Sequence, residues 1–518
     1  MTPSPVDGSP VIAGPPPLPA PAELPPGGPS GGADASVSTR SVDRALKRGI
    51  AWISAVKWST QLLAWGSTVI VARILSPDDY GLVGMAGLFL GLIMLLSEFG
   101  IGAAVVNMRD LTRSQIAQIN TLAVLFGGLG FLAGCAAAIP LGWFFHSPLL
   151  PPVVVAMSGV FAISAFRVVP YALLQRAHRF RAVALIDGGQ AALLAIANVV
   201  FAWLGFRYWT LVLSSVLGAV LSVGFAIWAA PHPFARPRRA EVGRAVRFSG
   251  HVIGSRLAWF TFTDSDFLVA GKMLGKEALG VYTLAWTLAN APIEKVTGMI
   301  ASVMPSIFSA VRTDKAALRR YLLMVSEAIA LIGIPLSVGG ALVAPLAVPI
   351  VLGDKWHAMI VPLQLLMSYA AFRSVSPLYS QVLQATGQAR FEMQTSVLGA
   401  LVLPMGFVLA SRWGVVGIAA AWLVLHPAIV FRSYRQMARS IDLPHATYLR
   451  SLWPAVSSAA GMAAAVAAVG MLSRGRLPSW ALLVAEVLTG ALVYGALLVS
   501  LHGPRLRALR HDWRTTRG

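Results

Sequence analysis

Five basic side chains interrupt the long apolar stretches of this sequence, at Lys57, Arg167, Arg256, Lys295 and Arg373. A charge inside a membrane segment is costly, so such residues are candidates for function by default. A shift of 199 residues places Lys57 on Arg256, while Arg167 and Arg373 each follow a phenylalanine and precede a proline by three or four residues. Facing inward, these four cations would line a cavity that attracts anionic substrates, because phosphate oxygens accept several charge-assisted hydrogen bonds from Arg and Lys.

The simpler interpretation of these cations is that their long side chains reach the membrane surface. Lys57 lies about seven residues, or roughly 10 Å, from the nearer end of its run, and Arg167 and Arg256 are similarly placed. Arg373 lies about fifteen residues, or roughly 22 Å, from either end, which exceeds the reach of a side chain. Lys295 directly follows Glu294, and adjacent helical residues do not face each other, so we expect its partner on another helix.

Acidic residues also fall inside apolar runs, and the main candidates are Glu98, Asp264, Asp266 and Glu294. Asp264 and Asp266 share one run and have no acidic counterpart in the matching run, where Trp65 and Ser67 align. Two interpretations stand for these carboxylates. They could bind a proton or a sodium ion that couples to transport, or they could pair structurally with a buried arginine.

Composition identifies the class of protein that carries these charges. Of the 518 residues, 56% are hydrophobic and 12% are charged, against about 25% charged in soluble domains. The net charge of +20 therefore indicates basic cytoplasmic loops of a membrane protein rather than a nucleic-acid-binding surface. A single cysteine, Cys135, excludes a disulfide framework, the nine histidines form no HExxH motif, and no GxxxxGK[ST] motif is present. We expect no cofactor and no direct use of ATP.

The apolar runs predict an all-α polytopic membrane protein with about fourteen transmembrane helices, because roughly 20 apolar residues span the hydrocarbon. The runs lie near 50–75, 80–106, 117–145, 150–175, 182–204, 208–230, 248–272, 279–309, 320–346, 358–386, 392–411, 415–438, 452–472 and 479–501. If the N-terminus is cytoplasmic, cytoplasmic segments hold 28 of the 41 Lys and Arg residues and the opposite side holds 8. This bias predicts that both termini are cytoplasmic.

An internal repeat organises these runs into two pseudo-symmetric six-helix lobes. The 199-residue shift aligns Leu75–Gly81 with Leu274–Gly280, and six runs per repeat keep both copies in the same orientation. We expect a disordered Pro/Gly-rich tail over 1–38, which an inert leader explains better than a recruitment segment. The remaining parts would be an N-lobe (39–230), a basic cytoplasmic linker (231–247), a C-lobe (248–440), two further spans (441–501) and a basic cytoplasmic tail (502–518).

Several motifs resemble those of one transporter family. Asp266-Phe-Leu-Val-Ala-Gly271, Leu274-Gly275, Leu279-Gly280-Val-Tyr282 and Asn290-Ala-Pro292 are typical of polysaccharide-export flippases. So are Leu75-Ser-Pro-Asp-Asp-Tyr-Gly81, Glu98-Phe-Gly100, Leu111-Thr112 with Gln115, and Leu383-Gln-Ala-Thr-Gly387 with Arg390-Phe391-Glu392. Over residues 48 to 440 the chain is similar to the Wzx-type branch of the multidrug/oligosaccharidyl-lipid/polysaccharide (MOP) exporter superfamily.

The resemblance implies a V-shaped pair of six-helix lobes that moves undecaprenyl-diphosphate-linked oligosaccharide across the bacterial inner membrane. Such a transporter would serve exopolysaccharide, capsule or O-antigen biosynthesis beside a polymerase and glycosyltransferases, and would not be an enzyme. The family's basic cavity residues carry over only as type and location, to Lys57, Arg167, Arg256 and Arg373. The acidic coupling site of related exporters does not map cleanly onto this sequence.

Two alternatives remain. A peptidoglycan-precursor or multidrug exporter could share this fold, although a drug-cation exporter favours acidic cavity residues and the pattern here is basic. A membrane polysaccharide polymerase or ligase is more remote, because such an enzyme needs catalytic residues on the outer side, usually in a sizeable loop, and the outer loops predicted here are short.

Overall fold

The structure is a computed structural model that describes residues 59–97, 102, 105–106, 108, 111–177, 179–238, 263–301, 304–473 and 475–515. Every regular element in these ranges is a helix. The predicted tail over 1–38 lies outside the described residues, as do Lys57, Glu98 and Arg256.

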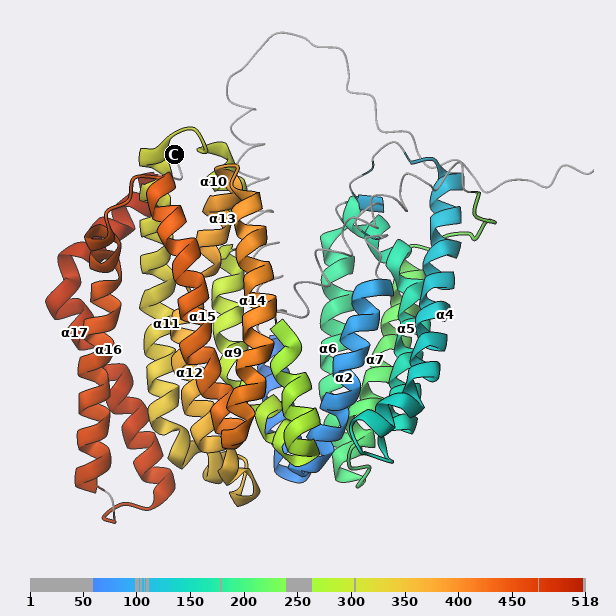
Figure 1. Cartoon of the computed structure of the whole chain (residues 1–518), viewed down its shortest axis with the longest axis horizontal. Coiled ribbons are helices and arrows are strands. Elements are labelled where there is room, and N and C mark those ends of the chain that lie inside the picture. Colours follow the sequence, from blue (N-terminus) through green and yellow to red (C-terminus); the bar gives the residue numbers. More distant parts are fainter. Residues whose placement is uncertain are drawn as a thin grey trace, which may run out of the picture. The chain divides into compact units, whose positions relative to one another are not determined.

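The first half of the chain forms a group of packed helices. After a helix over 59–74, the elements are α2 (Pro77–Ser97), α4 (Arg113–Phe144), α5 (Leu150–Arg176), α6 (Phe180–Trp203) and α7 (Trp209–Ala229). Helix α5 packs against both α4 and α7, and α6 packs against α7 (Figure 1). A capping box starts α4, because Thr112 accepts from the backbone N–H of Gln115 and the Gln115 side chain accepts from that of Thr112.

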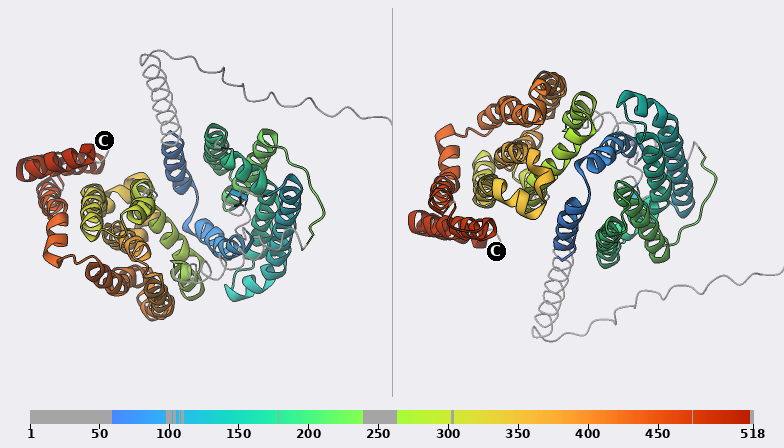
Figure 2. Two further views of the ribbon diagram at one scale, coloured as in Figure 1. Left: turned by 90° about the horizontal axis from the view of Figure 1, so that it is seen from above. Right: turned by 90° about the horizontal axis from the view of Figure 1, so that it is seen from below.

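The second half begins with a helix over 263–269 that widens into the π-helix η1 (Ala270–Leu274). It continues through α9 (Gly275–Ala301), α10 (Met304–Ala310), α11 (Lys315–Val351), η2 (Asp354–Met359), α12 (Ile360–Arg373) and α13 (Pro377–Ala385). The last elements are α14 (Ala389–Ala410), η3 (Ser411–Trp413), α15 (Gly414–Ser440), α16 (His445–Ser473) and α17 (Ser479–Thr515). Helices α16 and α17 lie together against α11 (Figure 2).

The described helices are those of a multi-pass membrane protein. Nine helical stretches in the described ranges are long and apolar enough to cross a membrane, and one of them, Ala389–Ser440, contains both α14 and α15. Large apolar side chains on these helices are exposed, among them Leu129, Leu401 and Leu492. A soluble protein does not expose apolar surface on this scale, whereas lipid contact requires it.

One predicted span differs from a single continuous helix. The run predicted over 358–386 is divided, because α12 ends at Arg373 and α13 begins at Pro377. Proline has no N–H to donate, so it suits the first turn of the second helix. Ser374 and Ser376 donate to the carbonyls of Ala371 and Arg373 and satisfy backbone oxygens at the break.

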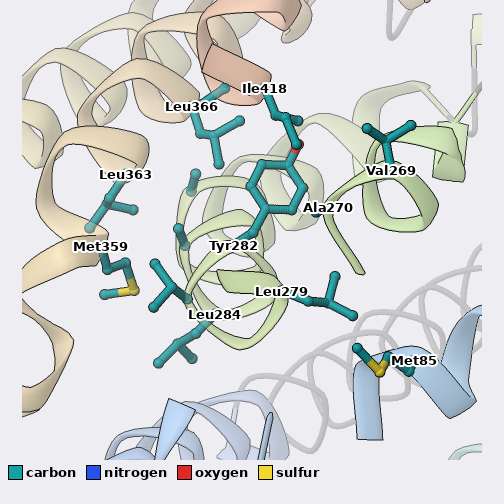
Figure 3. Close-up of a cluster of buried hydrophobic side chains, with 14 of the residues drawn as sticks. Met85, Val269, Ala270, Leu279, Tyr282, Leu284, Met359, Leu363, Leu366 and Ile418 are labelled. Atoms are coloured by element: carbon teal, nitrogen blue, oxygen red, sulfur yellow. The ribbon is translucent and has the colours of Figure 1, made fainter. Parts of the chain in front are cut away.

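The largest buried cluster joins α2, α9, α12 and α15. Tyr282 of α9 lies at its centre, among Leu279, Leu366 and Ile418 (Figure 3). Tyr282 and the equally buried Trp422 of α15 both contribute rings to this cluster, so aromatic packing fixes α9 against its neighbours.

Helices α2 and α9 also approach each other closely at two glycines. A Cβ atom at Gly81 would lie 1.6 Å from the carbonyl oxygen of Lys276, and one at Gly280 would lie 1.8 Å from that of Pro77. No side chain larger than hydrogen fits at either position. The 199-residue shift that relates Gly81 to Gly280 also relates Pro77 to Lys276.

Candidate functional site: an arginine at a helix break

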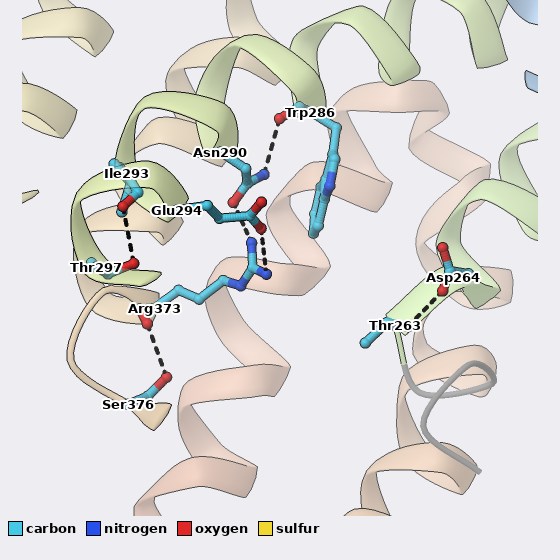
Figure 4. Close-up of polar contacts among 9 residues, drawn as sticks. All are labelled: Thr263, Asp264, Trp286, Asn290, Ile293, Glu294, Thr297, Arg373 and Ser376. Carbon is cyan, nitrogen blue, oxygen red and sulfur yellow. Dashed lines mark hydrogen bonds and ion pairs between the residues drawn. The ribbon is translucent and has the colours of Figure 1, made fainter. Parts of the chain in front are cut away.

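Arg373 is the last residue of α12 and lies beside the break in this membrane-spanning stretch. Its Nη1 donates to Oδ1 of Asn290 at 2.5 Å, and its Nη2 contacts Oε1 of Glu294 at 2.8 Å (Figure 4). Its guanidinium also lies over the ring of Trp286, with Cζ 5.6 Å from the ring centroid. The structure therefore gives Arg373 a carboxylate, an amide and an aromatic face as partners.

The three partners of Arg373 come from one face of α9. Trp286, Asn290 and Glu294 are spaced four residues apart, and side chains at this spacing lie one above another on a helix. The Nδ2 of Asn290 donates to the Trp286 carbonyl at 3.0 Å, so the amide oxygen faces Arg373. Helix α9 thus provides the three partner side chains on one side of the site, and the end of α12 provides Arg373 on the other.

A pocket of about 270 Å³ opens beside this cluster. It is lined by Asn290, Ile293, Glu294, Thr297, Ile329, Ala370, Arg373, Ser374, Pro377 and Leu378. The Arg373 side chain is 32% exposed and the Glu294 side chain 55% exposed. Charged groups with this exposure in a membrane span must face a hydrated space, because lipid would not solvate them. The site can therefore bind a polar, anionic group.

Arg167, the predicted counterpart of Arg373, has different partners. On α5, its Nη1 donates to Gln190 of α6 at 2.9 Å and to Ser222 of α7 at 2.7 Å, and it lies 4.0 Å from the Asp187 carboxylate. Tyr171 donates to that carboxylate at 2.6 Å. The structure brings Arg167 together with α6 and α7, whereas Arg373 binds to α9, so the two cations do not occupy equivalent environments.

The two aspartates of the seventh predicted span are separate from the Arg373 pocket. Asp266 is fully buried, and its Oδ2 accepts from the Tyr282 hydroxyl and, at 2.8 Å, from Nε1 of Trp422. Asp264 is partly buried and accepts from the Thr263 hydroxyl. Neither aspartate pairs with Arg373, because the carboxylate partner of Arg373 is Glu294 on α9.

The remaining site residues predicted from the sequence cannot be compared with the structure. Lys57, Arg256 and Glu98 lie outside the described residues, and the side chain of Lys295 does as well. The sequence interpretation missed Asn290 and Trp286 as partners of Arg373. The sequence does contain a signal for these partners. Trp286, Asn290 and Glu294 follow one another at intervals of four residues, which places all three on one face of an otherwise apolar helix.

The side chains around Arg373 are suited to binding a polar group. Within the described ranges, no group of three or more His, Cys, Asp or Glu residues is placed to hold a metal ion. The Arg373 cluster presents a guanidinium, a carboxylate and an amide at a pocket. An arginine held in this way recognises phosphate or carboxylate groups through paired hydrogen bonds.

Known proteins resemble this chain in sequence and in fold. It is 24% identical over 425 residues to the lipopolysaccharide biosynthesis protein WzxC of Escherichia coli K12, covering 77% of this chain and 84% of WzxC. It is 24% identical over 320 residues to the succinoglycan biosynthesis transport protein ExoT of Rhizobium meliloti 1021, covering 60% of this chain and 64% of ExoT.

Among solved structures, the lipid II flippase MurJ in an inward closed conformation superposes with a TM-score of 0.68. At 12% identity, the match covers 88% of this chain and 100% of the MurJ chain, and it shows the shared fold. A family model described as "Polysaccharide biosynthesis protein" matches residues 70–361, more than half of the sequence. The chain therefore belongs to the polysaccharide biosynthesis protein family of multi-pass membrane proteins.

Proposed function

We propose that this protein is a flippase that moves undecaprenyl-diphosphate-linked oligosaccharide across the bacterial inner membrane for exopolysaccharide, capsule or O-antigen biosynthesis. The observation that carries the proposal is Arg373, a partly exposed cation beside a pocket within a membrane-spanning stretch. A lipid-linked sugar diphosphate needs such a cation for its head group while its polyprenyl tail stays in lipid. Family membership and the names of WzxC and ExoT support the same pathway.

The proposed architecture has fourteen spans, in two six-helix lobes with two further C-terminal helices and both termini in the cytoplasm. The symmetric approach of α2 and α9 supports the repeat, because the residues in contact obey the same 199-residue shift as the sequence motifs. In this arrangement α2 belongs to the N-lobe and α9 to the C-lobe, so their crossing joins the two lobes. Polymerase and glycosyltransferases of the pathway would be its partners.

Alternating access is the proposed mechanism, and the contacts around the α2–α9 crossing would close the periplasmic side. Asp78 of α2 and Lys276 of α9 form an ion pair at 2.8 Å. Trp356 of η2 is fully buried, and its Nε1 donates to the carbonyl of Ala72 at 2.8 Å. These contacts join segments that the two-lobe architecture assigns to different lobes, so they must break when the transporter opens outward.

Ion coupling is assigned to the partly buried Asp264 rather than to Asp266. Asp266 already accepts hydrogen bonds from a phenol and an indole inside the aromatic core, which suits a structural role. A proton or a sodium ion at Asp264 would couple the transport cycle to an ion gradient, with no further cofactor.

A peptidoglycan-precursor exporter is the second candidate function. The fold of the lipid II flippase MurJ favours it, and lipid II also carries a diphosphate. The two candidate functions differ in cargo, because only a polysaccharide flippase would transport the repeat unit of a surface polymer.

The proposal is tested by deleting the gene in a strain that makes a surface polysaccharide. We expect surface polysaccharide to be lost and lipid-linked repeat units to accumulate in the membrane, and the full chain should restore export. Unchanged polysaccharide together with accumulated lipid II would instead establish the peptidoglycan-precursor function.

A further inference from the structure

We propose that Glu294 is a built-in counterion of Arg373, which an incoming lipid diphosphate must displace, and that this competition selects multiply charged head groups. The inference rests on the proposed function, since it assumes that Arg373 meets the diphosphate of the cargo. It assigns Glu294 a role in specificity, whereas Asn290 positions the guanidinium.

The geometry allows Glu294 to leave while Arg373 stays in place. Glu294 contacts Arg373 through a single oxygen, Oε1, on Nη2. Asn290 holds the other terminal nitrogen at 2.5 Å, and the Trp286 ring lies under the guanidinium. Because these two contacts do not involve the carboxylate, its displacement exposes Nη2 without releasing the arginine.

Because both side chains of the pair are partly exposed, displacing Glu294 requires little free energy. The side chain of Glu294 is 55% exposed and that of Arg373 is 32% exposed, so neither charge is desolvated as in a buried pair. Ion pairs exposed to water contribute little to stability. A buried ion pair would stay intact, whereas in this exposed pair a ligand can replace Glu294 as the partner of Arg373.

The competition favours anions of high charge. Glu294 brings one negative charge to the guanidinium, so an anion of equal charge gains little by replacing it. A diphosphate carries more charge and more acceptor oxygens, which can bind an arginine bidentately. The pocket of about 270 Å³ lies just below the roughly 300–1,000 Å³ of typical ligand sites. It therefore suits the head group alone, with sugar and tail outside.

The test measures binding of farnesyl diphosphate to the purified full-length protein in detergent, with farnesol as the probe of chain binding alone. Glu294→Gln keeps the side-chain shape and removes the charge, and we expect it to bind farnesyl diphosphate about tenfold more tightly. Glu277→Gln is the matched control, because Glu277 is an exposed carboxylate on the same helix, seventeen residues or roughly 25 Å away. We expect this control to bind as the wild type does.

A double variant separates this role from a general effect of charge. Arg373→Gln should lose most diphosphate binding, and adding Glu294→Gln to it should bring no gain, because the counterion acts only through the arginine. Equal tightening in both backgrounds, or no tightening in Glu294→Gln, would overturn the inference while leaving the proposed site intact. Unchanged binding in Arg373→Gln would instead overturn the site on which the proposed function rests. If Glu294→Gln does not accumulate, Glu294→Ala is measured with the same expected result.

Discussion

At the scale of single residues, the side chains around Arg373 distinguish it from Arg167. The Arg373 guanidinium contacts a carboxylate, an amide and an indole, and the residue also lines a pocket. Arg167 has the same charge but is held between α5, α6 and α7 by Gln190 and Ser222. The difference makes Arg373 the better candidate for contact with cargo.

Substitution of Arg373 should reduce transport without reducing the amount of protein. Arg373→Ala removes charged hydrogen bonds worth about 1.5–3 kcal/mol each, so we expect transport to fall about 10- to 100-fold. Arg373→Lys should be partly active, because a lysine cannot reproduce the planar fork, and Arg373→Glu should be inactive. The measurement is surface polysaccharide in a complemented null strain, with membrane abundance determined in parallel.

Arg412→Ala is the control for this series, since Arg412 is an exposed arginine in η3, away from the pocket residues. Wild-type export from Arg373→Glu would show that Arg373 does not take part in cargo binding. Loss of the protein itself would show that the ion pair with Glu294 is needed for folding.

The sequence predicted the importance of Arg373 but not its surroundings. Its distance from both ends of an apolar run is a property of the sequence and identified it directly. The sequence did not identify its carboxylate partner, which is Glu294 on α9. Which helix faces α12 is decided by packing of several helices around Trp422 and Tyr282, and apolar periodicity in one chain segment carries no information about that choice.

At the scale of elements, the apolar runs predicted the helices well and their interruptions poorly. The runs near 150–175 and 208–230 correspond closely to α5 and α7. Pro170 lies inside the continuous helix α5, whereas Pro377 starts a new helix after a break. A proline permits both outcomes, and tertiary packing selects between them. Similar sequence signals in the two repeats therefore produced different local structures.

Contacts between α2 and α9 should control the transport cycle. The Lys276 ammonium and the Asp78 carboxylate lie 2.8 Å apart, so a short bis-methanethiosulfonate cross-link between Asp78→Cys and Lys276→Cys, with Cys135→Ala, should block transport until it is reduced. Lys315→Cys with Asp442→Cys is the control, because that ion pair is equally close but joins α11 to the turn that follows α15. The measurement is export before and after reduction. Full activity with the α2–α9 cross-link formed would show that this crossing does not open.

At the scale of the whole molecule, the proposed transporter requires the predicted fourteen-span topology. Reporter fusions after Arg239 and Arg510 should be cytoplasmic, and fusions near Lys355 and Arg474 should be periplasmic, because basic residues are concentrated in cytoplasmic loops. The expected readout is activity of a cytoplasmic reporter at the first two sites and of a periplasmic reporter at the others. A periplasmic result at Arg239 would contradict the fourteen-span arrangement.

The class of the molecule could be predicted from composition, since 56% hydrophobic and 12% charged residues suit only a membrane protein. Dispersed motifs correctly predicted the family, which residues 70–361 establish. The nature of the cargo could not be predicted to the same depth. Sugar recognition depends on a few polar groups at the interface of many helices, and sequence spacing within one helix does not define them.

The most direct test of the central claim is transport by the purified protein in liposomes. The probe is fluorescent undecaprenyl-diphosphate-linked oligosaccharide, and a membrane-impermeant reductant destroys the label exposed in the outer leaflet. We predict that the wild-type protein makes the inner-leaflet label accessible, that Arg373→Glu does not, and that labelled phosphatidylcholine stays protected with both. Protection of the oligosaccharide lipid with the wild type, or equal exposure of all lipids, would contradict the account.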